Sequence, residues 1–338
     1  MPADAGARRR CVRRTYHSSP LEQAWLSAIS RDSSKNAVCQ RVRADQAHVK
    51  QLWLTLSAAW QNGSRTGDAW SREIFSRLVS EDACAPEEPA VTAPLEPLFG
   101  YLRHPLHACV KTWGVITDKQ YLVLPLVAEV LRPRRHGVRR PRAFFFDLGA
   151  STYARGMGGS SMNWFVDAYR RHGIAFDEIH AWEAKWARNP MGGAPQAVRE
   201  VTHFYNGVPV NATPGAPHNP LRLVAELTHE SDFVVLKMDF DQPAMEDALL
   251  DQLLGSPRLV ALIDELFYEQ VALHNPLVAF GPWRKAVGPF PGQGVDAHGL
   301  AIKRDRSNAA DATVVSLAES FALFHRLRNL GIRAHSWV

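Results

Sequence analysis

The chain has 338 residues, of which 46% are hydrophobic and 22% are charged. This composition is ordinary for a globular protein, and it excludes wholesale disorder, a collagen-like chain and a coiled coil. The length suits one large domain or two small ones. No apolar run reaches the roughly 18 residues that a membrane-spanning helix requires, so we expect a soluble chain with no membrane span.

The net charge of +5 originates in two short arginine-rich tracts. Residues 1–20 hold five Arg and one acid, and residues 132–142 hold six Arg and no acid. A nucleic-acid-binding surface is usually basic across a whole domain face, with aromatic residues interleaved, so nucleic acid is disfavoured as a partner. We predict a solvated tail and a solvated loop, with an anionic partner at 132–142 as the alternative.

The N-terminus and the cysteines give the only signals for a compartment. Residues 1–20 are predicted to be a basic, disordered tail, although they loosely resemble an organelle transit segment. The four cysteines, at positions 11, 39, 84 and 109, form no metal-binding or redox motif. Interpreted as free thiols, they favour a reducing, cytoplasmic compartment, with import into an organelle left open.

Residues 21–98 are predicted to form a helical N-terminal extension. Apolar residues recur at helical spacing around Trp25, Trp53 and Trp60, and such faces need a partner surface. Residues 81–98 contain four prolines and five acids, which is typical of a linker or an extended covering segment, and we place the boundary there. We expect the extension to pack on the rest of the chain.

From residue 99 to 338, short apolar runs alternate with helical patterns. The strand-like runs are 143–150, 176–184, 233–241 and 259–270. The helical patterns are 161–173, 220–230, 243–255 and 313–331, the last leading into a final strand-like segment. This alternation predicts an α/β fold with a doubly wound, mostly parallel, Rossmann-like sheet of about seven strands.

Acidic residues end several of the predicted strands. They are Asp147 on the first strand, just before Gly149, then Glu183 on the second, Asp239 and Asp241 on the fourth and Glu269 on the fifth. Ligands bind at the carboxyl ends of the strands in a doubly wound sheet, so these residues are candidate site residues. The alternative is that acids end strands only because loops are polar.

The loop after the first predicted strand reads DLGASTYARGMGGSS. Its glycines would let a ligand approach the backbone closely. An acid on the next strand, Glu183, suits a ribose diol, because a carboxylate accepts two hydroxyl hydrogen bonds. A GxGxxG fingerprint is absent, which disfavours a pyrophosphate, so the pattern favours a nucleoside without phosphates.

Four segments in this order, FFFDLGAS, IHAWEA, FVVLKMDFD and LIDELFYEQ, resemble class I S-adenosylmethionine-dependent methyltransferases of the FkbM type. The resemblance covers about residues 140–338. It implies that S-adenosyl-L-methionine is the cofactor and that the acceptor is a hydroxyl of a small molecule or glycan. The first loop departs from the DxGxGxG pattern of the family, and Asp241-Gln242 replaces its EG.

The resemblance also implies roles for individual residues. Asp147, Gly149, Ala150 and Ser151 would lie beside the methionine part of the cofactor, and Glu183 would hold the ribose.

An oxygen nucleophile needs a base to take its proton. Asp239, Glu269 and His274 are the predicted catalytic residues, and His203 is a further candidate base. We expect the fourth strand to lie beside the first, which would place Asp239 near Asp147. Asp239 is preferred over Asp241 because Pro243 indicates that the chain has already turned there.

Two other functions would use the same residues. Asp239-Phe240-Asp241 is a DxD motif, which in glycosyltransferases holds a divalent metal bound to a nucleotide diphosphate. A non-catalytic binding module on the same fold is the third possibility, because the first motif is incomplete. A glycosyltransferase does not account for the loop of small residues, so the methyltransferase, which needs no metal, is favoured.

Overall fold

Six parallel strands form the central sheet of this protein. The computed structural model describes residues 12–62, 70–102, 117–131, 140–155, 161–270, 272, 301–303 and 312–337. The strands of the central sheet are β4 (Ala143–Leu148), β5 (Glu178–Glu183), β6 (Thr202–Asn206), β7 (Phe233–Met238), β8 (Glu265–Tyr268) and β11 (Arg333–Ser336). Every residue of β4 and β7 is buried, as expected for strands covered on both faces.

The strand order is β11-β8-β7-β4-β5-β6, and each neighbouring pair is parallel. Numbered within the sheet, this is the order 3-2-1-4-5-6 of a doubly wound α/β fold, which reverses direction between β4 and β7. The sheet has six strands where the sequence predicted about seven. The expected neighbourhood of the first and fourth strands is confirmed, because Asp147 of β4 is in register with Lys237 of β7.

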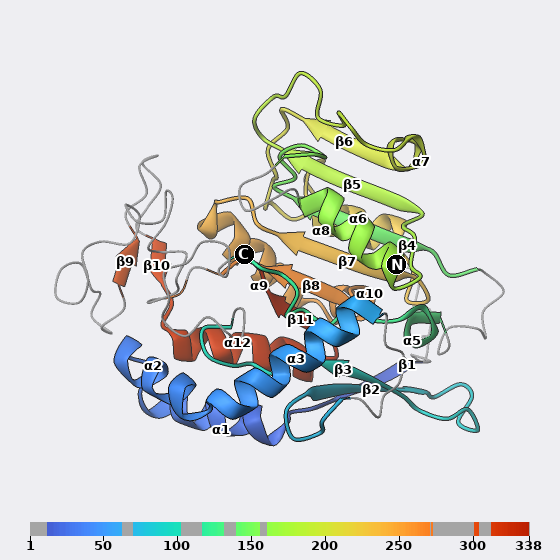
Figure 1. The fold of residues 1–338 in the computed structure, drawn as a ribbon. Coiled ribbons are helices and arrows are strands. Elements are labelled where there is room, and N and C mark those ends of the chain that lie inside the picture. Colours follow the sequence, from blue (N-terminus) through green and yellow to red (C-terminus); the bar gives the residue numbers. More distant parts are fainter. Residues whose placement is uncertain are drawn as a thin grey trace, which may run out of the picture.

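Helices cover both faces of the sheet (Figure 1). On one face, the ring of Phe145 lies 4.6 Å from that of Phe165 in α6 (Ser161–Arg171). On the other face, Tyr268 lies 6.4 Å from Phe324 of α12 (Leu317–Asn329), and its hydroxyl donates to Asp247 of α9 (Pro243–Gly255). The other helices along this part of the chain are α5 (Val127–Leu131), α7 (Gln196–Glu200), α8 (Pro220–Leu227) and α10 (Pro257–Leu262).

The N-terminal part lies along the β11 side of the sheet (Figure 1). It contains helices α1 (Pro20–Arg31), α2 (Lys35–Ala44) and α3 (Gln46–Asn62), and an antiparallel sheet of β1 (Val12–His17), β2 (Ser76–Asp82) and β3 (Val91–Leu95). Trp25 is fully buried, and it belongs to the same hydrophobic cluster as the central sheet. The N-terminal part and the sheet therefore share one core.

Two sequence-based predictions for this part are corrected. Residues 12–17 form β1 instead of belonging to a disordered tail, because Tyr16 is buried and the strand pairs with β2. Within 81–98, residues 91–95 form β3 although they include Pro94, and Leu95 and the following Glu96 are buried, so this part is not a linker and agrees with the alternative of an extended covering segment. Proline is tolerated here because β3 is an edge strand.

Two predicted elements begin at different residues in the structure. The run 259–270 contains the end of α10 followed by β8, because Ser256 caps the helix and Pro257 occupies its first turn. The last helix begins at Leu317, where Ser316 and Glu319 form a capping box, and residues 312–314 before it form β10, which pairs with β9 (Ala301–Lys303).

The prediction of free thiols is wrong for the two described cysteines, Cys39 and Cys84. Both are disulfide-bonded. Their sequence spacing gave no sign of this, because the fold decides which distant thiols meet. Disulfides persist mainly in oxidising compartments, so the cysteines no longer support a cytoplasmic location.

A buried ion network joins the N-terminal part to the end of the chain. Arg328 of α12, only 1% exposed, donates to the carboxylates of Glu22 and Glu96 at 3.2 and 3.1 Å. Nδ1 of His335 lies 2.7 Å from Glu96 and Nε2 lies 3.4 Å from Glu265, which also pairs with Arg333 at 2.7 Å. Charges so deeply buried are stable only when they are paired.

The network sets the titration of two of its members. Burial alone would lower the pKa of His335, but Glu96 and Glu265 outweigh burial and raise it. Burial alone would raise the pKa of Glu96, but His335 and Arg328 outweigh it and lower that pKa. The stabilisation from His335 is therefore lost as pH rises through its raised pKa, and that from Glu96 is lost as pH falls through its lowered pKa.

Removing the central arginine should destabilise the fold strongly. In Arg328→Met, Glu22 stays buried without a counter-charge, and breaking such a pair costs about 3–5 kcal/mol of unfolding free energy. The control is Arg13→Met, which removes an exposed pair with Glu81 and should cost less than about 1 kcal/mol. Urea unfolding of the two variants measures the difference, and equal costs would contradict a structural role for the network.

Candidate functional site

The candidate site lies at the carboxyl ends of β4, β5, β7 and β8, where the sheet order reverses. The loops after β4 and β7 touch through their backbones. Gly149 has φ +85°, and a Cβ atom there would overlap the carbonyl oxygen of Asp239 and lie 2.9 Å from Cα of Phe240. Only glycine fits this contact, because it lacks a Cβ and adopts positive φ without strain.

Lys237 links the end of β4 and the loop that follows it to the end of β7. Its side chain is 0% exposed, and its ammonium donates to Oδ1 of Asp147 at 3.0 Å and to the carbonyl oxygens of Leu148 and Gly149 at 3.2 and 3.0 Å. Burial alone would lower the pKa of Lys237, but Asp147 and Asp239 outweigh it and raise that pKa. Lys237 is therefore a buried cation that fixes the geometry of this edge.

Asp147 is enclosed and does not open toward a ligand. It is 0% exposed, and besides Lys237 it accepts the hydroxyl of Ser161 at 3.0 Å. The hydroxyl ties the first turn of α6 to the end of β4. Asp147, which was predicted to lie beside the cofactor, is thus engaged with Lys237 and Ser161.

Glu183 positions the loop after β4. One carboxylate oxygen accepts the backbone N–H of Ser151 at 2.9 Å, and the other accepts that of Lys185 at 2.8 Å. Ser151 has φ +55°, which this hydrogen bond helps to hold, and Ala150 beside it is fully buried. Each carboxylate oxygen keeps a further lone pair for another donor.

Asp239 follows β7 and is partly open to solvent, with 24% of its side chain exposed. Its Oδ2 accepts the indole N–H of Trp337 at 3.0 Å and lies 3.6 Å from the ammonium of Lys237. The ring of Trp337 is itself packed against Trp164 and covered by the ammonium of Lys119, 4.8 Å from its centre. Oδ2 of Asp239 is therefore fixed, while part of the side chain remains accessible to solvent.

Three carboxylates converge at this edge. Oxygen atoms of Asp239, Asp241 and Glu269 all lie within 4.8 Å of one another. Asp241 is exposed and has φ +60°, whereas Glu269 is 7% exposed. Such a group can take protons from a substrate or bind a divalent cation.

Other predicted residues lie elsewhere or outside the described residues. His274 and the glycine-rich stretch 156–160 are outside the described part of the chain. His203 lies near the beginning of β6, far along the strand direction from the carboxyl edge, so it does not join Asp239 and Glu269. Of the arginine-rich tract, 132–139 is not described, and Arg142 pairs with Glu178.

Sequence reasoning missed Lys237 and Trp337. A single lysine within the apolar run FVVLKM was a usable signal, because a lysine in a strand buried on both faces needs an anionic partner. Trp337 carried no such signal, since its approach to Asp239 depends on the order of the strands.

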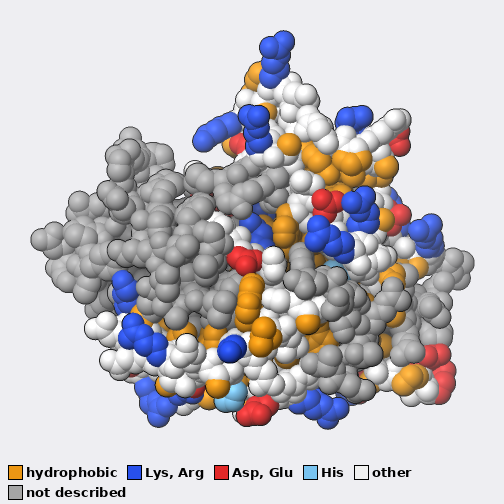
Figure 2. Space-filling model, in the orientation of Figure 1, with side chains coloured by type: hydrophobic (Ala, Val, Ile, Leu, Met, Phe, Trp, Pro, Cys, Tyr) orange, Lys and Arg blue, Asp and Glu red, His pale blue; other side chains and the backbone are white. Residues whose placement is uncertain are grey.

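The basic side chains of the described residues do not gather in one place on the face of the molecule in Figure 2. On the described part of the face in Figure 2, the Lys and Arg side chains stand in several separate places. Among the described residues, no helix has both the length and the apolar character to span a bilayer.

Comparisons were made with protein-family models, curated proteins and solved structures. None of the three gave a match to this chain.

Gly149→Ala should be far more costly than a glycine substitution that meets open space. The new methyl group would collide with the backbone at Asp239 and would also require a strained φ, so we expect a loss of about 3 kcal/mol or more of unfolding free energy. Gly215→Ala is the control, because φ is +77° there and nothing lies within 4 Å, which leaves only a strain cost of about 1–2 kcal/mol. Thermal and urea unfolding measure both, and similar losses would refute the close contact.

Proposed function

We propose that this protein is an S-adenosyl-L-methionine-dependent O-methyltransferase that acts on a hydroxyl of a small molecule or glycan. The observation that carries the proposal is the arrangement at the reversal of the sheet. The Gly149–Ser151 loop follows β4, Glu183 is the last residue of β5, and Asp239 follows β7. A hydrogen bond joins the loop to Glu183, and Gly149 contacts Asp239. Ligands of doubly wound sheets bind at this place.

The residues present fit a nucleoside with a hydroxylated ribose. Glu183 stands at the end of the second strand with lone pairs left for two hydroxyl donors. Ala150 and Ser151 are small, so a ligand can approach the loop, and Lys237 is already engaged with Asp147 and backbone carbonyls. Glu183 would hold the ribose, and the loop at Gly149–Ser151 would lie beside the methionine part.

When bound, the cofactor supplies an electrophilic methyl group on a sulfonium. The chain would orient the acceptor hydroxyl and receive its proton. Asp239 would receive the proton, and its partial exposure and its contacts with Trp337 and Lys237 support this role. Glu269, which lies within 4.8 Å, is the second candidate. Much of the rate would come from positioning.

Binding of the cofactor should depend on Glu183. Loss of charge-assisted hydrogen bonds in Glu183→Ala should weaken the binding of S-adenosylhomocysteine by roughly ten- to a hundredfold, measured by calorimetry. Glu183→Gln keeps the shape and should have a smaller effect in the same direction. Glu226→Gln removes an exposed carboxylate on α8 and should leave the affinity unchanged. Unchanged affinity in a folded Glu183→Ala protein would refute the assignment.

A second candidate function is a metal-dependent glycosyltransferase, which the convergence of Asp239, Asp241 and Glu269 favours. These oxygens suit Mg²⁺ or Mn²⁺, which a nucleotide diphosphate would share. A non-catalytic binding module would bind S-adenosylhomocysteine without transferring a methyl group.

Two isosteric variants separate these functions. A labelled methyl donor is incubated with the protein and a metabolite extract, and transfer of the label is compared between wild type, Asp239→Asn and Asp241→Asn. Methyl transfer with Asp239 as base predicts that Asp239→Asn loses at least 100-fold in transfer, while Asp241→Asn retains most of it. Asn tolerates the positive φ of position 241, so the fold should persist.

The contrary outcomes are distinct. Binding of a nucleoside diphosphate only in the presence of Mn²⁺, abolished by either variant, would favour the glycosyltransferase. Binding of S-adenosylhomocysteine with no transfer into the extract would favour the binding module.

A further inference from the structure

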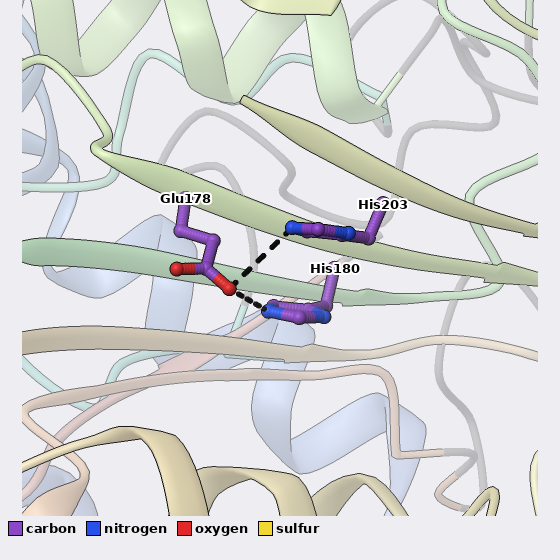
Figure 3. Close-up of side chains that lie close together, drawn as sticks. All are labelled: Glu178, His180 and His203. Atoms are coloured by element: carbon purple, nitrogen blue, oxygen red, sulfur yellow. Dashed lines mark hydrogen bonds and ion pairs between the residues drawn. The ribbon is translucent and has the colours of Figure 1, made fainter. Parts of the chain in front are cut away.

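A second polar cluster lies at the opposite ends of the strands from the candidate site. Glu178 opens β5, His180 follows two residues later, and His203 lies beside it on β6. Figure 3 shows both imidazole rings directed toward the same carboxylate oxygen. Oε1 of Glu178 is 2.8 Å from Nε2 of His180 and 3.5 Å from Nε2 of His203, and all three atoms lie within 4.8 Å of one another.

The ring of His180 is held in place by its neighbours. The ring of His180 is stacked between Phe146, at 5.1 Å, and His203, at 4.8 Å, with interplanar angles of 11° and 12°. Its Nε2 donates to Glu178 at 2.8 Å, and its Nδ1 lies 3.0 Å from the hydroxyl of Tyr205. The Tyr205 hydroxyl can accept an Nδ1–H, so the proton can move to Nδ1 and free the lone pair of Nε2 when an ion displaces the hydrogen bond to Glu178. Sites on strands, with such supporting contacts, are geometrically precise.

The other groups near the cluster leave Oε1 available. Arg142 donates to Oε2, the second carboxylate oxygen of Glu178, and forms an ion pair with it there. Burial, together with His203 and Arg142, outweighs Glu178 and lowers the pKa of His180. His203 is 58% exposed, so the cluster is open to solvent on one side.

We propose that Glu178, His180 and His203 bind a Zn²⁺ ion, with water completing the coordination. Two imidazole nitrogens and one carboxylate oxygen are a ligand set that Zn²⁺ uses with an open fourth position. Bonds of about 2.0–2.2 Å in a tetrahedron place ligand atoms roughly 3.4 Å apart. The 3.5 Å distance already meets this value, and the 2.8 Å hydrogen bond has to open by about half an ångström. Because an imidazole nitrogen binds a metal in the plane of its ring, the exposed ring of His203 also has to turn out of its stack on His180.

The bound ion would replace the weakest contact of the cluster. His203 approaches Glu178 at a distance too long for a strong hydrogen bond, and it lies on β6, the edge strand of the sheet. Zn²⁺ would tie β6 to β5 through His203 and His180. This site is separate from the proposed methyl-transfer site, so each can fail without the other.

The test is calorimetric titration of the untagged, full-length protein with Zn²⁺ after treatment with a chelator. Wild type should bind one Zn²⁺ saturably, with a higher melting temperature in its presence. His203→Ala, at an exposed position, should keep the circular dichroism spectrum of the fold and bind Zn²⁺ at least tenfold more weakly. Glu178→Gln, which keeps the shape of the side chain, should also weaken binding at least tenfold.

The matched control is His48→Ala. His48 is 44% exposed on α3 and lies 3.7 Å from the carboxylate of Glu73, so it imitates the histidine–carboxylate pair at a distant place. Its removal should leave the affinity for Zn²⁺ unchanged. The proposal is overturned if wild type shows no saturable binding, if His203→Ala and Glu178→Gln bind Zn²⁺ as wild type does, or if His48→Ala weakens binding as much as they do.

Discussion

The buried ammonium of Lys237 is the interaction on which the candidate site depends. Moving a lysine out of water costs several kcal/mol unless anions and carbonyl oxygens replace the water. Asp147 and the carbonyls of Leu148 and Gly149 do so, which requires the loop after β4 to bend back over β7. That bend brings Gly149 onto the backbone at Asp239. The charge thus explains the glycine, the positive φ and the place of the partly exposed Asp239.

The same principle operates on a larger scale at the β11 edge. Arg328 is more than 200 residues along the chain from Glu22 and from Glu96, and all three are buried. If the N-terminal helices and strands left the sheet, Arg328 would lose its carboxylate partners, Glu22 and Glu96, and would be buried without a counter-charge or exposed to solvent. The shared hydrophobic cluster adds to this coupling. The N-terminal part is therefore a structural component of the central fold.

The two polar clusters on the sheet differ in the chemistry they can perform. At the carboxyl edge, Asp239, Asp241 and Glu269 offer only oxygen atoms, which suits proton transfer or a hard cation. At the opposite ends of β5 and β6, Glu178 is joined by the imidazoles of His180 and His203, which suits a transition-metal ion. Parallel strands separate such clusters because their two ends form opposite edges of the sheet.

The order of apolar and amphipathic segments along the chain was enough to predict alternating strands and helices, and hence the parallel sheet. Apolar runs such as 143–148 and 233–238 are short and alternate with helical patterns, which is typical of strands buried on both faces, and the structure confirms both strands. Asp147, Glu183 and Asp239 follow directly from this pattern, as the residues at strand ends. The pattern failed at β1 and β3, where Arg13, Arg14 and Pro94 conceal strands that pair with β2.

Which side chains meet could not be predicted from the order of segments. Asp147 and Lys237, or His180 and His203, are brought together by strand order and register, which no local periodicity contains. The same holds for the hydrogen bond from Trp337 to Asp239 and for the fact that Cys39 and Cys84 are each disulfide-bonded. Local sequence fixes the conformation of a segment through nearby contacts, whereas a site is made by contacts between segments that are distant along the chain.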